Sequence, residues 1–177
     1  MSRGNSRNMT WKDIILSCIY GPLMVLQLVL FFICNNYLGL DILAYFGLFI
    51  WALSILFGVL PIYTFRKRGG VAKGQSYMKT TRLVDTGVYS IVRHPQYLAG
   101  LLLIIALMLT TQHWLSIVAG AIAFVTFYYD TLRADKHLIE KFGDEYKAYM
   151  RRVPRLNFLL GIARRMRRTT PRAEKIN

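Results

Sequence analysis

The sequence predicts an all-α membrane protein, and two observations carry that prediction. Of the 177 residues, 54% are hydrophobic, while the formal net charge is +14. These two properties occupy separate segments, because Lys and Arg gather in the flanks and in one loop while long apolar stretches lie between them. That separation is typical of a multi-span protein whose basic parts share one side of a bilayer. It indicates membrane lipids as partners, and it argues against nucleic acid.

The first two apolar stretches predict one transmembrane hairpin. We expect spans at residues 14–34 and 42–60, the second closed by Pro61. The connection between them is short and carries no Lys or Arg, so the two helices should run antiparallel. The first span follows a basic start and resembles a signal peptide, but it is longer than a cleavable core, so we expect it to be retained.

The next two apolar stretches predict a second hairpin. Spans are expected at residues 96–110 and 114–130, with Pro95 in the first turn of the earlier one. Thr110 to His113 break the apolar run and supply the turn. Both stretches are somewhat short against the ~20 residues that cross a bilayer. The prediction is therefore about four transmembrane helices within a single membrane domain, residues 1–177.

The polar segments have their own organisation. Residues 65–95 form a long loop that is rich in Gly, Tyr, Arg and His, a mixture that favours a functional loop over a disordered one. After Asp130, apolar residues recur at helical spacing, which predicts amphipathic helices over residues 131–160. A break is expected at Gly143-Asp144. Residues 161–177 read as a basic tail near lipid headgroups.

The distribution of Lys and Arg predicts the orientation of the chain. Three precede the first span, seven lie between Phe65 and Pro95, and thirteen follow Asp130, whereas the two short turns have none. Both termini and the long loop should therefore be cytoplasmic. The two cysteines lie 16 residues apart in one predicted helix, roughly 24 Å, too far for a disulfide. No zinc-type Cys/His cluster is present, so no metal is expected.

The second half of the long loop holds the richest side-chain chemistry. Gly87 permits a close backbone approach, and Tyr89 and Tyr97 offer flat faces and hydroxyls. Arg93 and His94 directly precede a predicted helix N-terminus, a place that favours an anion. Such residues could hold a small zwitterion that carries a carboxylate and a flat ring. A positive loop with interfacial tyrosines explains the same residues equally well.

Two blocks of sequence narrow these readings. The first, preceded by Leu83-Val84, is Gly87-x-Tyr89-x-x-x-Arg93-His94-Pro95-x-Tyr97-x-x-Gly100. The second is Phe142-Gly143-Asp144-Glu145-Tyr146-x-x-Tyr149, followed by Arg152-Val153-Pro154. Together and at this spacing they resemble the signature of the isoprenylcysteine carboxyl methyltransferase and phospholipid methyltransferase superfamily. The resemblance covers about half of the chain, from the long loop to the end of the second block.

The resemblance implies a methyltransferase that uses S-adenosyl-L-methionine and acts on a lipophilic acceptor entering from the bilayer. It implies cofactor contacts from Leu83, Val84, Gly87, Tyr89, Arg93, His94, Pro95, Gln96 and Tyr97. Thr81 and Arg82 are expected neighbours, and Gln75 is a further candidate. His94 would help to hold the methionyl end of the cofactor. The oligomeric state is left open.

The sequence departs from the family pattern ahead of the second block. Where the family has an Arg and, a turn later, two adjacent acidic residues, this chain has Asp130, Ala134 and Asp135. Arg133 substitutes for that Arg only if the helix is shifted. Asp135 and Arg133 are therefore the candidate catalytic residues. Two acceptors stay open: a prenylcysteine-type carboxylate, which the resemblance implies, and a phosphatidylethanolamine-type amine, which acidic residues suit better.

Two further readings compete with methyl transfer. Sterol reductases carry a similar Arg-His-Pro-x-Tyr block but use a nicotinamide cofactor, and they are longer proteins with more spans. A membrane interaction protein that has lost its activity would account for Ala134. Binding of S-adenosylmethionine or of NADPH separates these readings.

Overall fold

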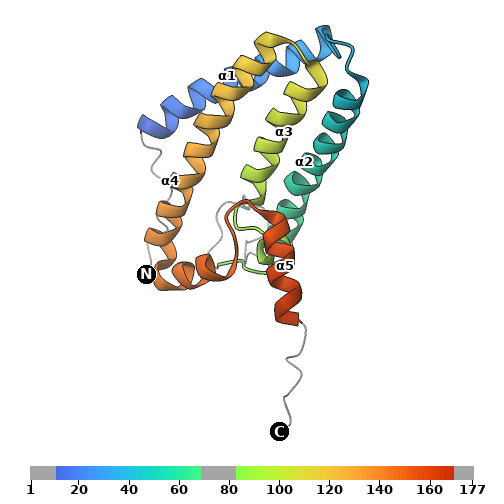
Figure 1. Ribbon diagram of the computed structural model, residues 1–177. Coiled ribbons are helices and arrows are strands. Elements are labelled where there is room, and N and C mark those ends of the chain that lie inside the picture. Colours follow the sequence, from blue (N-terminus) through green and yellow to red (C-terminus); the bar gives the residue numbers. More distant parts are fainter. Residues whose placement is uncertain (1–10, 69–82, 170–177) are drawn as a thin grey trace. The chain divides into compact units, whose positions relative to one another are not determined.

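Helices make up every regular element in the part of the chain that the computed structural model describes, residues 11–68 and 83–169 (Figure 1). The elements are α1 (Trp11–Ile33), α2 (Asp41–Arg68), the short 3-10 helix η2 (Gly87–Ser90), α3 (Pro95–Thr111), α4 (Trp114–Arg152) and α5 (Phe158–Thr169). The all-α prediction is confirmed for these residues. The chain divides into two compact units, one made of the residues up to Val59 with Gln96–His137, the other of Leu60–Pro95 with the residues from Leu138 onward.

Among residues 11–68 and 83–169, three helices are long and apolar enough to cross a membrane. They are Ile14–Ile33 of α1, Asp41–Thr64 of α2, and α4. Large apolar side chains on them face outward, as Phe32 and Val125 do with 76% and 66% of their surface exposed. Continuous exposed apolar surface of this kind suits lipid and not water. α3 is apolar as well but has 17 residues, so the count of four spans stays a prediction.

α3 is the best-buried helix of the first unit. Leu101, Ile104, Ala106 and Leu107 are each at most 4% exposed. α2 approaches α3 closely because it offers small side chains: the Ser54 hydroxyl donates to the carbonyl of Ala99 at 2.8 Å. A Cβ on Gly47 would lie 2.7 Å from Cγ2 of Thr110. The close packing of α2 on α3 therefore depends on small residues of α2, Gly47 and Ser54.

A buried polar side chain ties α1 to two other helices of the same unit. Gln27 is fully buried, and its Nε2 donates to the carbonyl of Ser116 at 3.1 Å and to that of Ile104 at 3.4 Å. Gly120 leaves room for it, since a Cβ there would lie 2.4 Å from Nε2. Polar links of this type stabilise helix association where lipid supplies no hydrogen-bond partner.

The two short turns of the first unit are hydrogen-bonded to each other, at the top of Figure 1. The backbone N–H groups of Asn36 and Tyr37 donate to the carbonyls of Thr110 and Thr111 at 2.8 and 3.0 Å. The Gln112 side chain completes the pairing by accepting from Leu40 N at 3.1 Å and donating to Leu40 O at 2.9 Å. Gln112 has a positive φ of 56°, and α3 ends just before it. The predicted break is confirmed for Gln112 and His113, whereas Thr110 and Thr111 are the last residues of α3.

Two predicted helix boundaries differ from the structure. α2 does not end before Pro61 but continues through it to Arg68. A proline inside a helix forfeits one backbone hydrogen bond, and membrane helices tolerate that loss. The predicted tail is also partly helical, because α5 runs across its start at residue 161 and ends at Thr169.

α4 combines an apolar half and a charged half in one continuous element. It runs past Asp130 without a break and changes direction at Gly143, whose φ of 56° and ψ of −129° are not helical. Only glycine adopts this backbone conformation without strain, which explains the residue at that position. The predicted break at Gly143 is confirmed, and it separates the two turns of helix that carry Tyr146 and Tyr149 from the rest of α4.

Candidate functional site

The first sequence block begins with a turn that depends on glycine. Gly87 opens η2 with a φ of 65°, a conformation that L side chains rarely adopt. A Cβ at this position would also lie 3.1 Å from both Oγ1 and Cγ2 of Thr64 in α2. The Ser90 hydroxyl closes the turn by donating to the carbonyl of Gly87 at 2.7 Å. The close neighbour of Gly87 is therefore the Thr64 side chain, and the approach of a ligand to Gly87 stays a prediction.

The segment after η2 is paired with the end of the second block. The N–H of Arg93 donates to the carbonyl of Pro154 at 3.0 Å, and that of His94 to the carbonyl of Arg155 at 3.2 Å. Both side chains are buried, at 9% and 6% exposed. These two N–H groups are thus used within the protein, so an anion at this place would depend on the side chains and on the first turn of α3, which begins at Pro95 as predicted.

Two buried tyrosines of the second block reach the first block. Tyr149 donates its hydroxyl to the carbonyl of Tyr89 at 2.6 Å. The hydroxyl of Tyr146 lies 3.4 Å from Nε2 of His94. Tyr146 and Tyr149 are 1% and 2% exposed, and with Val153 they form a hydrophobic cluster against which Leu83 packs. The two blocks that the sequence pairs by resemblance therefore meet in one cluster of the second unit.

Burial keeps the Tyr149 hydroxyl protonated. Tyr149 lies in the charged half of α4, beyond its apolar stretch, and burial raises the pKa of its phenol well above the ordinary value. The neighbouring phenols of Tyr146 and Tyr89 add to this rise in pKa. The hydroxyl therefore acts as a donor at every physiological pH, which suits its bond to a backbone carbonyl. At the edge of the cluster, Arg152 makes a longer and more exposed contact with Asp85 at 3.5 Å.

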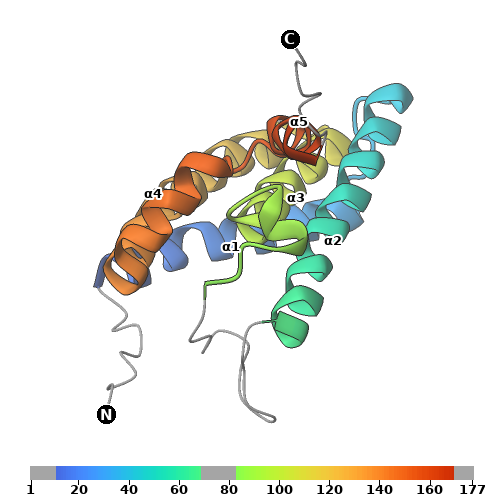
Figure 2. The same cartoon turned by 90° about the horizontal axis from the view of Figure 1, so that it is seen from below.

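α5 contacts the same segment, a contact that sequence reasoning missed. Arg165 donates to the Ser90 hydroxyl at 2.7 Å and to the carbonyl of Gly87 at 3.4 Å. Gly161 lies so close to Ile91 that a Cβ would fall 1.8 Å from the Ile91 carbonyl oxygen. The signal that could have revealed it is a single glycine within an otherwise amphipathic run. Residues 83–95, which we call the motif segment (green), and α5 (red) can be followed in Figure 2.

The first unit contains the remaining candidates. Tyr97 donates its hydroxyl to Oδ2 of Asp130 at 3.0 Å, and its ring lies 5.3 Å from that of Phe127. Asp130 is therefore the acceptor for a residue of the first block, although it stands where the family has an Arg. Asp135 is 3% exposed and Ala134 7%. Arg133 is half-buried on the same helix, α4, and Gln96 is exposed at the start of α3.

The structure thus brings together part of the predicted set. Within the second unit it joins Leu83, Tyr89 and His94 to the tyrosines of the second block. Val84 and Pro95 are buried nearby in sequence. Gln75, Thr81 and Arg82 lie outside the described residues, so their assignment as cofactor contacts stays a prediction.

Comparisons with known proteins bear on the family. A family model described as phospholipid methyltransferase matches residues 23–145, which is more than half of the chain and includes the whole first block. The chain is also similar to the nickel-cobalt-cadmium resistance protein NccN of Alcaligenes xylosoxydans xylosoxydans, at 36% identity over 76 residues. That alignment covers 43% of this chain, and it spans about a third, 36%, of the relative's length. The family match and the meeting of the two blocks lead to one conclusion: this chain belongs to the phospholipid methyltransferase family, whose members are integral membrane methyltransferases.

Proposed function

We propose that this protein transfers a methyl group from S-adenosyl-L-methionine to a lipophilic acceptor. The observation that carries the proposal is the contact of both blocks in the second unit, where Tyr149 donates to the carbonyl of Tyr89 and Tyr146 approaches His94. These contacts hold the backbone from Leu83 to His94 in one defined conformation. A fixed backbone is what positional catalysis requires, because the methyl group of a sulfonium is already activated and the protein mainly orients it.

The residues of the first block fit such a cofactor by their chemistry. Arg93 and His94 offer a cation and a donor for a carboxylate, and Tyr89 offers a flat face. Gly87 lets the Thr64 side chain come close, which a larger residue at this position would prevent. The proposed cofactor set is Leu83, Val84, Gly87, Tyr89, Arg93, His94, Pro95, Gln96 and Tyr97, with Gln75, Thr81 and Arg82 from the undescribed loop.

The resemblance alone suggests carboxyl methylation of a prenylcysteine-type acceptor, and one observation favours a phospholipid amine instead. Tyr97, a residue of the first block, is hydrogen-bonded to Asp130 and not to an Arg. A carboxylate at this position attracts an ammonium group and repels a carboxylate acceptor. An ammonium must also lose a proton before it attacks the methyl group, and Asp135 is the residue that we propose as its acceptor. If the acceptor were instead a carboxylate, Arg133 would be the residue that binds it.

The orientation belongs to the same proposal. The Lys and Arg distribution supports a cytoplasmic position for both termini and for the residues of the long loop. An acceptor with a lipid tail would then enter from the inner leaflet. A water-soluble acceptor without a tail should be methylated far more slowly, and equal rates for the two would contradict this route.

The proposal is tested by ligand binding to the purified protein in detergent. We expect S-adenosylmethionine to bind and NADPH not to bind, because a reductase would show the reverse. His94→Ala should weaken binding at least 10-fold, while His113→Ala, in the turn before α4 and outside both sequence blocks, should leave it unchanged. No affinity for S-adenosylmethionine in folded protein would overturn the proposal and favour a non-catalytic membrane protein.

The acceptor is then identified with labelled cofactor. Purified protein is incubated with phosphatidylethanolamine or with a prenylcysteine, and the products are separated by mass spectrometry. We expect label in the phospholipid headgroup. Label in an alkali-labile ester would instead show carboxyl methylation and would make Arg133 the residue to examine.

A further inference from the structure

α5 presents two sides with different properties. Leu159, Ile162 and Met166 recur at three- and four-residue spacing, so they share one side of the helix. They are 67%, 41% and 64% exposed, although all three are apolar. On a different side, Gly161 and Arg165 contact the motif segment at Ile91, Gly87 and Ser90. The helix is therefore attached to the second unit by one side and leaves an apolar side uncovered.

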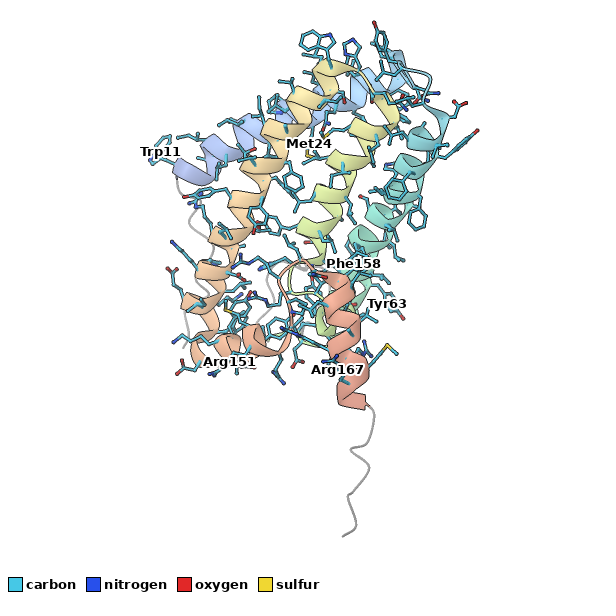
Figure 3. The ribbon with its side chains drawn as sticks, in the orientation of Figure 1. Trp11, Met24, Tyr63, Arg151, Phe158 and Arg167 are labelled. Atoms are coloured by element: carbon cyan, nitrogen blue, oxygen red, sulfur yellow. The ribbon has the colours of Figure 1, made fainter. Side chains whose placement is uncertain are left out.

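The charge of α5 has one sign. The segment Phe158–Thr169 contains four arginines, at positions 164, 165, 167 and 168, and no acidic residue. Arg164 and Arg167 are exposed, whereas Arg165 is engaged with the motif segment. Figure 3 shows Phe158 at the start of α5 and Arg167 near its end. By helical spacing Arg167 borders the apolar side of α5, and Arg164 lies on the side opposite to it. A helix with one exposed apolar side and exposed arginines elsewhere is typical of a helix that lies in a bilayer interface and binds anionic lipid.

We propose that α5 is a membrane-surface helix that binds anionic phospholipid headgroups. Leu159, Ile162 and Met166 enter the boundary between headgroups and acyl chains, and Arg164 and Arg167 bind the phosphates. A membrane location of the protein is supported separately, because three other helices in the described part of the chain are long and apolar enough to cross a bilayer. This inference does not rest on methyl transfer, since it uses only the exposed sides of α5.

Complementarity of charge and polarity indicates which molecule binds the exposed surface of α5. A neutral lipid would satisfy the apolar side but leave the arginines without a partner of opposite charge, and an acidic soluble protein would leave the apolar side in water. Anionic phospholipid satisfies both sides at once. Arg165 has a separate role in this arrangement, because its guanidinium contacts Ser90 and Gly87 and so fixes which side of α5 remains outward.

A fluorescence experiment on the full chain tests the proposal. Both native cysteines are replaced by Ala, Met166→Cys is introduced, and an environment-sensitive fluorophore is attached there. The protein is placed in nanodiscs of phosphatidylcholine alone or with about one third phosphatidylglycerol. We expect a blue-shifted emission only with phosphatidylglycerol, reversed by raising the salt from about 0.05 to about 0.5 M.

Two matched pairs of substitutions identify the residues responsible. Arg164→Gln with Arg167→Gln should shift the equilibrium between lipid-bound and lipid-released α5 about 30-fold toward the released state, given ~1 kcal/mol for each basic residue at an anionic surface. Lys136→Gln with Arg151→Gln removes the same charge from exposed positions on α4 and should leave the emission unchanged. Equal emission in both nanodiscs, or equal effects of the two pairs, would overturn the proposal. All four positions are exposed, so circular dichroism should show unchanged helicity.

Discussion

Gly87 is constrained twice, by its own backbone and by a neighbour. Its φ of 65° lies in the left-handed region, and Thr64 is in close contact. Gly87→Ala should lower the free energy of unfolding by about 1–2 kcal/mol for the backbone conformation alone, with a further loss from the 3.1 Å contact. Thermal unfolding in detergent measures the effect.

Gly39 provides the matched control for this prediction. It has nearly the same φ, 68°, but no atom lies within 4 Å of where its Cβ would be. Gly39→Ala therefore reports the backbone cost without the contact. The difference between the two variants gives the contribution of Thr64, and it should shrink when Thr64→Ala is added to Gly87→Ala. If both glycine substitutions lowered the free energy of unfolding equally, the Thr64 side chain would move aside without measurable cost.

Single residues also show what sequence patterns can and cannot provide. Gly87, Tyr89 and His94 were found because their spacing resembles a known block, and the structure gives each a defined neighbour. Arg165 was missed because a run of arginines near a terminus predicts a basic tail near lipid headgroups. Its contact with Ser90 joins residues 75 positions apart, which no local pattern reports.

At the scale of elements, the last turns of α4 connect the two blocks. Tyr149 and Tyr146 are three residues apart on the same side, so both reach the motif segment. Their bonds differ in length, at 2.6 Å to the Tyr89 carbonyl and 3.4 Å to His94. This part of α4 begins directly after Gly143, whose backbone is not helical.

This difference predicts the outcome of two conservative changes. Tyr149→Phe leaves the buried carbonyl of Tyr89 without its donor and should cost about 1–3 kcal/mol of stability. Tyr146→Phe removes a longer bond and should cost less, while it changes the environment of His94. We therefore expect Tyr149→Phe to lower the melting temperature more, and Tyr146→Phe to alter cofactor affinity. Equal effects on both measurements would contradict this division.

Element boundaries were the weakest part of the sequence prediction, for a physical reason. Pro61 reads as a helix end because proline lacks an N–H, yet α2 continues to Arg68. In an apolar helix the surrounding turns remain the best arrangement for backbone groups that have no water to bind. Pro95 and Gly143, in contrast, stand where their backbone preferences and the packing agree, and there the predictions were correct.

At the scale of the whole molecule, charge and hydropathy predicted the class of protein, and contacts between distant segments decided the rest. The all-helical, apolar character follows from composition, because few other structures satisfy backbone groups in lipid. The pairing of the two short turns does not follow from it. That pairing depends on Gln112, whose side chain bonds Leu40 on both its N–H and its carbonyl.

The paired turns make the number of spans testable. Asn36 and Tyr37 bond Thr110 and Thr111, so the turn after α1 and the turn before α4 must lie on one side of the membrane. α2 and α3 then either both cross the membrane or both fail to cross it, and we predict that both cross. In a chain without its native cysteines, Asn35→Cys and Trp114→Cys should react with a membrane-impermeant maleimide in intact cells. Lys147→Cys, in the charged half of α4, should react only after permeabilisation if that half is cytoplasmic. Labelling of Trp114→Cys only after permeabilisation would show that α3 does not cross, and reversed labelling of all three would invert the proposed orientation.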